Sequence, residues 1–155
     1  MRIFLAYPFT QLLVPESGLV EPRATSFLLT AVEELTRRGH SVFSAHRREA
    51  FGKELMAPDV ATFLDYEEMC KADYVVAFPG NKLISGGVHI ELGWAAAMRK
   101  PIAMFLAHTQ SYSPLVTGLH KITEVKYIFF HEDGDDVLVT RVVAEIDRVM
   151  EATRV

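Results

Sequence analysis

The sequence is poor in cysteine, has no surplus of positive charge and contains no long apolar run. Its single cysteine, Cys70, cannot form an internal disulfide and provides no cysteine cluster for a metal ion. Lysine and arginine number 16 against 20 aspartate and glutamate residues, and no basic stripe typical of nucleic-acid-binding proteins is visible. No apolar run approaches the roughly 20 residues that a membrane-spanning helix requires. These absences argue against nucleic-acid and membrane partners and predict a cytoplasmic protein.

The sequence does contain apolar segments with two alternating kinds of spacing. Short apolar runs predict strands at residues 3–7, 41–45, 74–78, 101–106 and 127–130. Apolar positions at helical spacing predict helices at residues 23–38, 58–71, 88–98 and 137–152. In the second helix, the side expected to be buried consists of Val60, Phe63, Leu64 and Met69.

This alternation of strands and helices predicts one α/β domain spanning residues 1–155. We expect a mostly parallel five-stranded sheet with helices on both faces, a Rossmann- or flavodoxin-like three-layer sandwich. Ligands of such sheets bind at the carboxyl ends of the strands. The site is therefore expected in the loops that follow Tyr7, Ala45, Phe78 and Leu106.

The segment at residues 79–91 carries the strongest indication of a ligand site. It begins with Pro79-Gly80, and Gly86 and Gly87 let the backbone approach a ligand closely just before a helix, whose first amides favour an anion. The hydroxyl of Ser85 adds a donor, so a phosphate or a simple chain reversal fits this turn equally well. Glu91 follows in the expected first turn of the helix, where a carboxylate is within reach of a sugar whose phosphate is held by the glycines.

Several other polar or aromatic residues are expected near the same edge. Asp65 lies beside an apolar position of its helix and is a candidate to donate a proton, although it also fits a solvated acidic face. Tyr7 and Phe9 end the first strand, where an aromatic ring either packs in the core or contacts a base or a carboxylate. Arg47 and Arg48 end the second strand and are expected to point different ways, one toward an anion and the other toward Glu49 or solvent.

Together these residues resemble the nucleoside 2-deoxyribosyltransferase superfamily, over a match from Phe4 to about Leu119. The match depends on Asp65 ahead of the strand at 72–77 and on residues 87–95, Gly-Val-His-Ile-Glu-Leu-Gly-Trp-Ala. The second stretch is similar to the family's Gly-x-x-x-Glu-hydrophobic-Gly-aromatic-Ala signature. Within the superfamily, the segments at 45–50, 76–80 and 115–119 resemble cytidylate and hydroxymethylcytidylate N-glycosidases, and the chain is also similar to 2′-deoxynucleoside 5′-monophosphate N-hydrolases.

The resemblance implies hydrolysis of the N-glycosidic bond of a nucleoside 5′-monophosphate. Family transferases usually carry an acidic residue where this chain has Ser85, and that residue binds the free 5′-hydroxyl of a nucleoside. A serine donates to a phosphate that a carboxylate would repel. Thr10 stands where the hydroxymethylcytidylate enzyme has an arginine that recognises the base, so cytidylate is the expected substrate.

The resemblance also assigns roles to the site residues. Glu91 attacks the anomeric carbon, Asp65 protonates or holds the departing base, Tyr7 orients Glu91, and Phe9 packs on the base. Ser85 and Gly87 hold the phosphate, helped by Arg47 or Arg48, while Thr117 completes the site of a neighbouring subunit in a homodimer. No cofactor is implied, and the histidines show no metal-ligand spacing, so no metal is expected.

Three alternative functions remain open at this stage. A nucleoside deoxyribosyltransferase would pass the sugar to a second base. A lysine-decarboxylase-like phosphoribohydrolase also joins glycines to a glutamate in Pro-Gly-Gly-x-Gly-Thr-x-x-Glu, but here Gly80 is separated from Gly86 and Gly87 and no Gly-Thr follows. A non-catalytic nucleotide-binding module would bind a monophosphate without releasing base.

Overall fold

Five parallel strands form one sheet in the part of the chain that the structure describes, residues 1–80, 84–131 and 134–153. In this computed structural model the sheet order is β2-β1-β3-β4-β5, and every neighbouring pair is parallel. The strands are β1 (Arg2–Ala6), β2 (Ser41–Phe43), β3 (Tyr74–Ala77), β4 (Ile102–Ala107) and β5 (Val125–Phe130). Because helices cover both faces, β3 and β4 are buried along their whole length.

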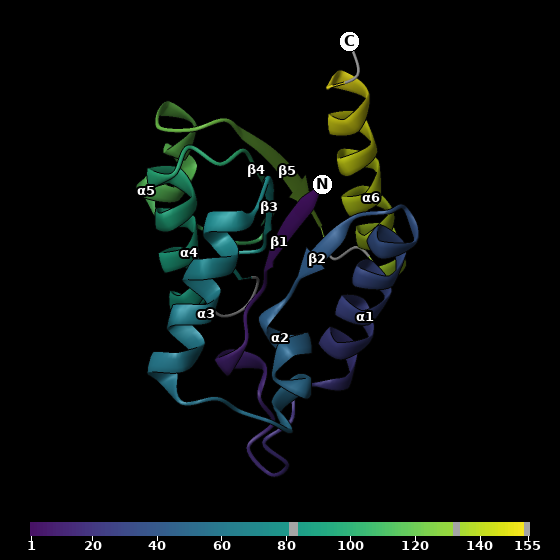
Figure 1. Cartoon of the computed structure of the whole chain (residues 1–155), viewed down its shortest axis with the longest axis vertical. Coiled ribbons are helices and arrows are strands. Elements are labelled where there is room, and N and C mark those ends of the chain that lie inside the picture. Colours follow the sequence, from purple (N-terminus) through teal and green to yellow (C-terminus); the bar gives the residue numbers. More distant parts are fainter. Residues whose placement is uncertain (81–83, 132–133, 154–155) are drawn as a thin grey trace.

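Helices form the two outer layers of a three-layer sandwich (Figure 1). One layer consists of α1 (Pro22–Arg37) and α6 (Asp135–Ala152), and the other of α3 (Pro58–Lys71), α4 (Gly86–Ala97) and the short α5 (Pro114–Thr117). The predicted α/β architecture is confirmed, and each of the four long helices begins and ends within two residues of its predicted bounds. The remaining helical pieces are short: α2 (Ala45–Arg48), η1 (Thr10–Leu12), η2 (Ala50–Gly52) and η3 (Leu119–Lys121).

The core is divided by the sheet into two parts. Successive strand residues point to opposite faces, so Ile3 and Leu5 pack against α1 and α6, whereas Phe4 and Ala6 pack against the layer of α3 and α4. A residue near the end of β1 therefore lies in the same layer as the strand residues whose positions alternate with it. Tyr7 belongs to the layer of α1 and α6.

The predicted buried side of α3 is only partly correct. Met69 is fully buried and Leu64 is partly buried, but Val60 and Phe63 are 46% and 62% exposed. The first half of α3 extends beyond the carboxyl ends of the strands (Figure 1), so no sheet lies beneath it to bury these side chains. The apolar spacing therefore correctly predicts a helix, but a smaller part of that helix packs against the core than the spacing indicates.

The region after the second strand also differs from the prediction. β2 ends at Phe43, and His46, Arg47 and Arg48 lie in α2 instead of at the end of the strand. The loop after β4 contains α5, a turn of helix that its proline-bearing sequence did not suggest. Within the described ranges, the helices are too short or too polar to cross a lipid bilayer.

Candidate active site

The site lies where the strand order of the sheet reverses. From β1 the chain continues to β2 on one side, and from β3 it continues to β4 on the other, so a crevice is expected outside the carboxyl ends of β1 and β3. Helix α4 begins shortly after β3 and α3 ends just before it. These two helices pack on the same face of the sheet and carry the two predicted carboxylates.

Ser85 is the N-cap of α4. Its Oγ accepts a hydrogen bond from the Val88 amide at 3.4 Å, which leaves the hydroxyl proton available to donate elsewhere. Gly86 and Gly87 are the first two helical residues, so their amides have no partner within the helix. Among the described residues, a Cβ at Gly86 would meet no atom within 4 Å, and one at Gly87 would meet only Ser85 Oγ, at 3.9 Å. Packing against the described residues therefore does not require these glycines, and those residues leave the space above them open to a ligand.

The helix starts two residues earlier than predicted, and this changes the place of Glu91. Glu91 lies in the second turn of α4, four residues after Gly87, instead of in the first turn. Residues four apart lie on the same side of a helix, and side chains lean toward the helix N-terminus. The Glu91 side chain therefore leans toward the open backbone at Gly87.

Glu91 and Asp65 form an acid pair between α4 and α3. Burial of the Glu91 carboxyl and the negative charge of Asp65 raise the pKa of Glu91 to about 8, and the positive charge of Arg48 opposes this shift. Burial also raises the pKa of Asp65, again against the effect of Arg48. A pKa of about 8 favours the protonated form of Glu91 at neutral pH, because a second negative charge near Asp65 is unfavourable in this sheltered site. The two predicted acids are thus brought together.

Arg48 connects the acid pair to a third carboxylate. Its Nη1 donates to Asp65 Oδ1 at 2.6 Å, and its Nη2 donates to Glu49 Oε1 at 2.8 Å. The other oxygen of Glu49 accepts the Met56 amide at 3.2 Å, and the guanidinium lies 5.5 Å from the centre of the Phe43 ring. The phosphate-binding role predicted for Arg48 stays a prediction, but two of its donor groups already have carboxylate partners.

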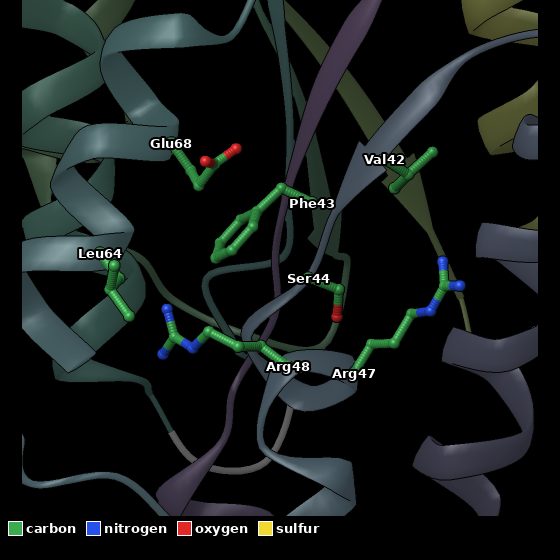
Figure 2. A pocket seen from close by; sticks show the side chains of 7 residues that line it. All are labelled: Val42, Phe43, Ser44, Arg47, Arg48, Leu64 and Glu68. Carbon is green, nitrogen blue, oxygen red and sulfur yellow. The ribbon is translucent and has the colours of Figure 1, made fainter. Parts of the chain in front are cut away.

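A groove of about 470 Å³ lies beside this network. Figure 2 shows Arg48 reaching across it toward Leu64 on α3, while Arg47 points away toward α1, so the two arginines diverge as predicted. Buried polar atoms without a hydrogen-bond partner include Ser44 Oγ and Arg48 Nε, and both residues line the groove. The lining residues are Val42, Phe43, Ser44, Arg47, Arg48, Leu64 and Glu68.

Tyr7 lies in an aromatic cluster on the other layer. Its ring packs against Phe27, Phe78 and His46, with centroid separations of 5.3, 5.2 and 5.9 Å. Burial, followed by the charges of Asp135 and Glu21, raises the pKa of Tyr7 to about 12. These contacts do not bring Tyr7 to Glu91, because the alternation along β1 directs it to the layer of α1 and α6. Its orienting role stays a prediction that no contact here supports.

His46 is a residue whose position the sequence did not reveal. It is 1% exposed, its Nε2 donates to the Pro8 carbonyl at 2.8 Å, and burial lowers its pKa to about 4. The neutral ring packs on Phe9 with a centroid distance of 4.5 Å, so α2 is tied to the loop that follows β1. The signal in the sequence is the place of His46 at the end of the segment predicted as the second strand, next to Arg47 and Arg48.

Three further predicted site residues, Gly80, Thr10 and Thr117, lie outside the network of Arg48, Asp65 and Glu91. Gly80 has φ +128°, and its carbonyl accepts the Tyr112 hydroxyl at 2.9 Å, which joins the loop after β3 to the loop after β4. Thr10 is exposed in η1, and Thr117 is exposed at the end of α5. Residues 81–83 of the predicted ligand segment lie outside the described residues.

Comparison with solved structures places this geometry among known proteins. The solution structure of BlsM is 36% identical to this chain, with a TM-score of 0.72, and the match covers 94% of this chain and 93% of that one. The Clostridium botulinum CMP N-glycosidase BcmB is 29% identical, with a TM-score of 0.66, and the match covers 92% of this chain and 98% of that one. The chain belongs to the nucleoside 2-deoxyribosyltransferase superfamily.

A 2-deoxyribosyltransferase of Bacillus psychrosaccharolyticus shares the fold at 24% identity and a TM-score of 0.57, with the match covering 88% of this chain and 90% of that one. No protein-family model and no curated protein sequence matches the chain. In this member of the nucleoside 2-deoxyribosyltransferase superfamily, the signature at residues 87–95 lies on α4 and Asp65 lies on the neighbouring α3.

Proposed function

We propose that this protein hydrolyses the N-glycosidic bond of a nucleoside 5′-monophosphate, with a CMP-like pyrimidine nucleotide favoured. The products are the free base and ribose or deoxyribose 5-phosphate. The observation that carries the proposal is the acid pair of Glu91 and Asp65, which lies one helical turn beyond the open backbone at Gly86 and Gly87. Catalytic acids and nucleophiles are typically found where burial and a neighbouring charge shift a pKa in this way.

The geometry of α4 relates the phosphate to the sugar. A phosphate at the start of a 12-residue helix is stabilised by the free amides of Gly86 and Gly87 and by the Ser85 hydroxyl. The sugar attached to that phosphate then lies over the next turn, on the side to which Glu91 leans. Holding the anomeric carbon beside a carboxylate in this way converts attack into an effectively intramolecular step.

The proposed reaction has two steps and needs one proton on the acid pair. Glu91, as carboxylate, attacks the anomeric carbon and forms an ester, while Asp65, as carboxylic acid, gives its proton to the departing base. Water then attacks the ester, Asp65 takes a proton from that water, and Glu91 is released as carboxylate. The pair therefore ends the cycle with the single proton with which it began.

A panel of ribo- and deoxyribonucleosides and their 5′-monophosphates, analysed by chromatography for free base, tests the proposal. We expect release of base from at least one pyrimidine monophosphate and no need for a second base. Release that occurs only when an acceptor base is added would identify a transferase. Binding of monophosphates with no release of base under either condition would identify a nucleotide-binding module and contradict the proposal.

Replacing Ser85 by aspartate is expected to raise the KM for a monophosphate about a hundredfold, because a carboxylate a few ångströms from a phosphate repels it. Aspartate is as good an N-cap as serine, so α4 keeps its first turn. Ser113→Asp is the matched control, since Ser113 caps α5 in the same way through the Leu115 amide. Equal KM values for Ser85→Asp and the parent protein would show that the phosphate binds elsewhere.

The proposal includes a homodimer, in which α3 and α4 provide the interface. Five large apolar side chains of this layer, on α3, α4 and α5, are exposed in the single chain, and Tyr66 meets Trp94 edge-to-face across α3 and α4. Exposed apolar surface of this extent is typical of a protein interface. The exposed residues are Val60, Phe63, Tyr66, Ile90 and Leu115.

Phe63→Glu is expected to convert the dimer to a monomer, as measured by light scattering after gel filtration, because a charge would be buried in the interface. The activity should fall with it if Thr117 completes the site of the neighbouring subunit. Leu29→Glu, at a 48% exposed leucine of α1 on the opposite layer, is the control and should remain dimeric. A Phe63→Glu protein that stays dimeric would exclude this face as the interface.

A further inference from the structure

A partly buried arginine with two carboxylate partners lies next to the acid pair. Arg48 lies on α2, and its hydrogen bonds run to Asp65 on α3 at 2.6 Å and to Glu49 at 2.8 Å. The side chains of Arg48, Asp65 and Glu49 are 15%, 17% and 10% exposed. Charge pairs this sheltered interact far more strongly than surface pairs, and removing one partner leaves a costly unpaired charge.

We propose that Arg48 and Glu49 are positioning residues which govern where the single proton of the acid pair resides. Arg48 holds Asp65 as a carboxylate in the free protein, so the proton stays on Glu91 until substrate is bound. Glu49 provides the guanidinium with a second partner, so Asp65 can take the proton from Glu91 without leaving this partly buried arginine unpaired. This inference rests on the proposed function for its catalytic consequence, but not for the position of the proton.

The architecture around Glu49 supports a fixed anchor. Glu49 is 8% exposed, and its second carboxylate oxygen accepts the Met56 amide, so the carboxylate is held from both sides. The backbone that follows is unusual, because Ala50 and Phe51 have φ of 47° and 55° although neither is glycine. Left-handed backbone at such residues persists only where the surroundings impose it. Glu49 directly follows α2, which fixes its backbone, and the Met56 amide beyond the strained turn fixes its side chain.

Among the described residues, the charged groups that act on the acid pair come from three elements. Arg48 comes from α2, with Glu49 directly after it, Asp65 comes from α3 and Glu91 from α4. The positive charge of Arg48 lowers the proton affinity of both acids, whereas the negative charge of Glu49 raises that of Asp65. Removing Arg48 and removing Glu49 should therefore move the protonation of Asp65 in opposite directions.

Measuring kcat/KM against pH for Arg48→Met and Glu49→Gln tests this. The acidic limb of the profile reports the second proton that the pair gains at low pH, and the alkaline limb reports the loss of its last proton. In Arg48→Met both limbs should move to higher pH, because both acids lose a cationic neighbour. In Glu49→Gln the acidic limb should move to lower pH and kcat should fall about tenfold with KM nearly unchanged, since Arg48 now has only Asp65. In the double variant, the loss of kcat that Glu49→Gln causes alone should disappear, because it acts through Arg48.

Arg37→Met and Glu34→Gln are the matched controls, as they break an arginine–glutamate pair on the surface of α1 at 2.8 Å and should leave both limbs in place. If the Arg48 and Glu49 variants lose activity but neither limb of the pH profile moves, these residues have only a structural role and the inference is overturned.

Carboxyl ¹³C NMR of the parent protein provides a readout independent of activity. At neutral pH we expect Asp65 ionised and Glu91 protonated, and the reverse assignment would overturn the inference even if every variant failed to fold. A parent protein that releases no base but shows the expected protonation would contradict the proposed function and leave the role of Arg48 intact.

Discussion

Replacing Glu91 by alanine is expected to lower the turnover of a nucleoside monophosphate by about a thousandfold or more while leaving its binding nearly unchanged. The carboxylate is proposed to form the bond to the sugar, and no other acid lies on the same side of α4 within one turn of Gly87. The phosphate contacts come from Ser85 and the amides of Gly86 and Gly87, which the substitution does not touch. The measurements are single-turnover base release and calorimetric binding of the monophosphate.

Two further variants make this result specific to Glu91. Glu91→Gln keeps the size of the side chain and should be equally inactive, which separates loss of the nucleophile from loss of packing. Glu67→Gln, at a partly exposed acid of α3 outside the pair, should retain parental activity. Base release by Glu91→Ala at the parental rate would mean that the mechanism proposed here is wrong.

Asp65→Asn is expected to lower kcat for a pyrimidine monophosphate about a hundredfold or more, because an amide gives no proton to the departing base. Removing the negative charge of Asp65 also lowers the pKa of Glu91, so the nucleophile becomes easier to ionise. The loss should be smaller for a substrate with a better leaving group, since such a base departs without protonation. Comparing the two substrates distinguishes loss of an acid from general damage to the site.

The pH dependence of the same two proteins provides a second test. In the parent protein the pair loses its last proton at about pH 8, the pKa to which burial and the charge of Asp65 raise Glu91. Above that pH both acids are ionised, so kcat/KM should fall about tenfold for each further pH unit. In Asp65→Asn the only proton is on the nucleophile, so activity should no longer fall on the alkaline side. An alkaline limb unchanged in the variant would show that Asp65 is not the acid.

The protonation of Glu91 also affects stability. Its pKa is raised on folding from an ordinary value of 4.5 to about 8, so the folded protein favours the neutral form. The contribution of this group to the free energy of unfolding is therefore fully favourable below about pH 4.5 and declines as the pH rises toward 8. A group retained at this cost to stability is typical of an active site.

Much of the fold could be predicted because its signals are local. Strand β3 is a continuous apolar run, and the helices show apolar positions every three or four residues. The joint role of Asp65 and Glu91 came from the family resemblance, since the local pattern around Asp65 also fits a solvated acidic face. The exposure of Val60 and Phe63 could not be predicted, because their spacing fits a buried helix face and only the position of α3 beyond the sheet leaves them in solvent.

The sequence by itself determined the order of strands and helices and the parallel sheet, because apolar periodicity and turn residues act over a few neighbouring positions. Only the tertiary structure decided that Tyr7 belongs to the other layer and that Arg48 holds Asp65, 17 residues away, with Glu49 as its second anchor. These contacts depend on how α2 packs against α3 and on which face each strand residue takes. No pattern within a single segment contains that information, because the residues involved meet only when distant segments pack together.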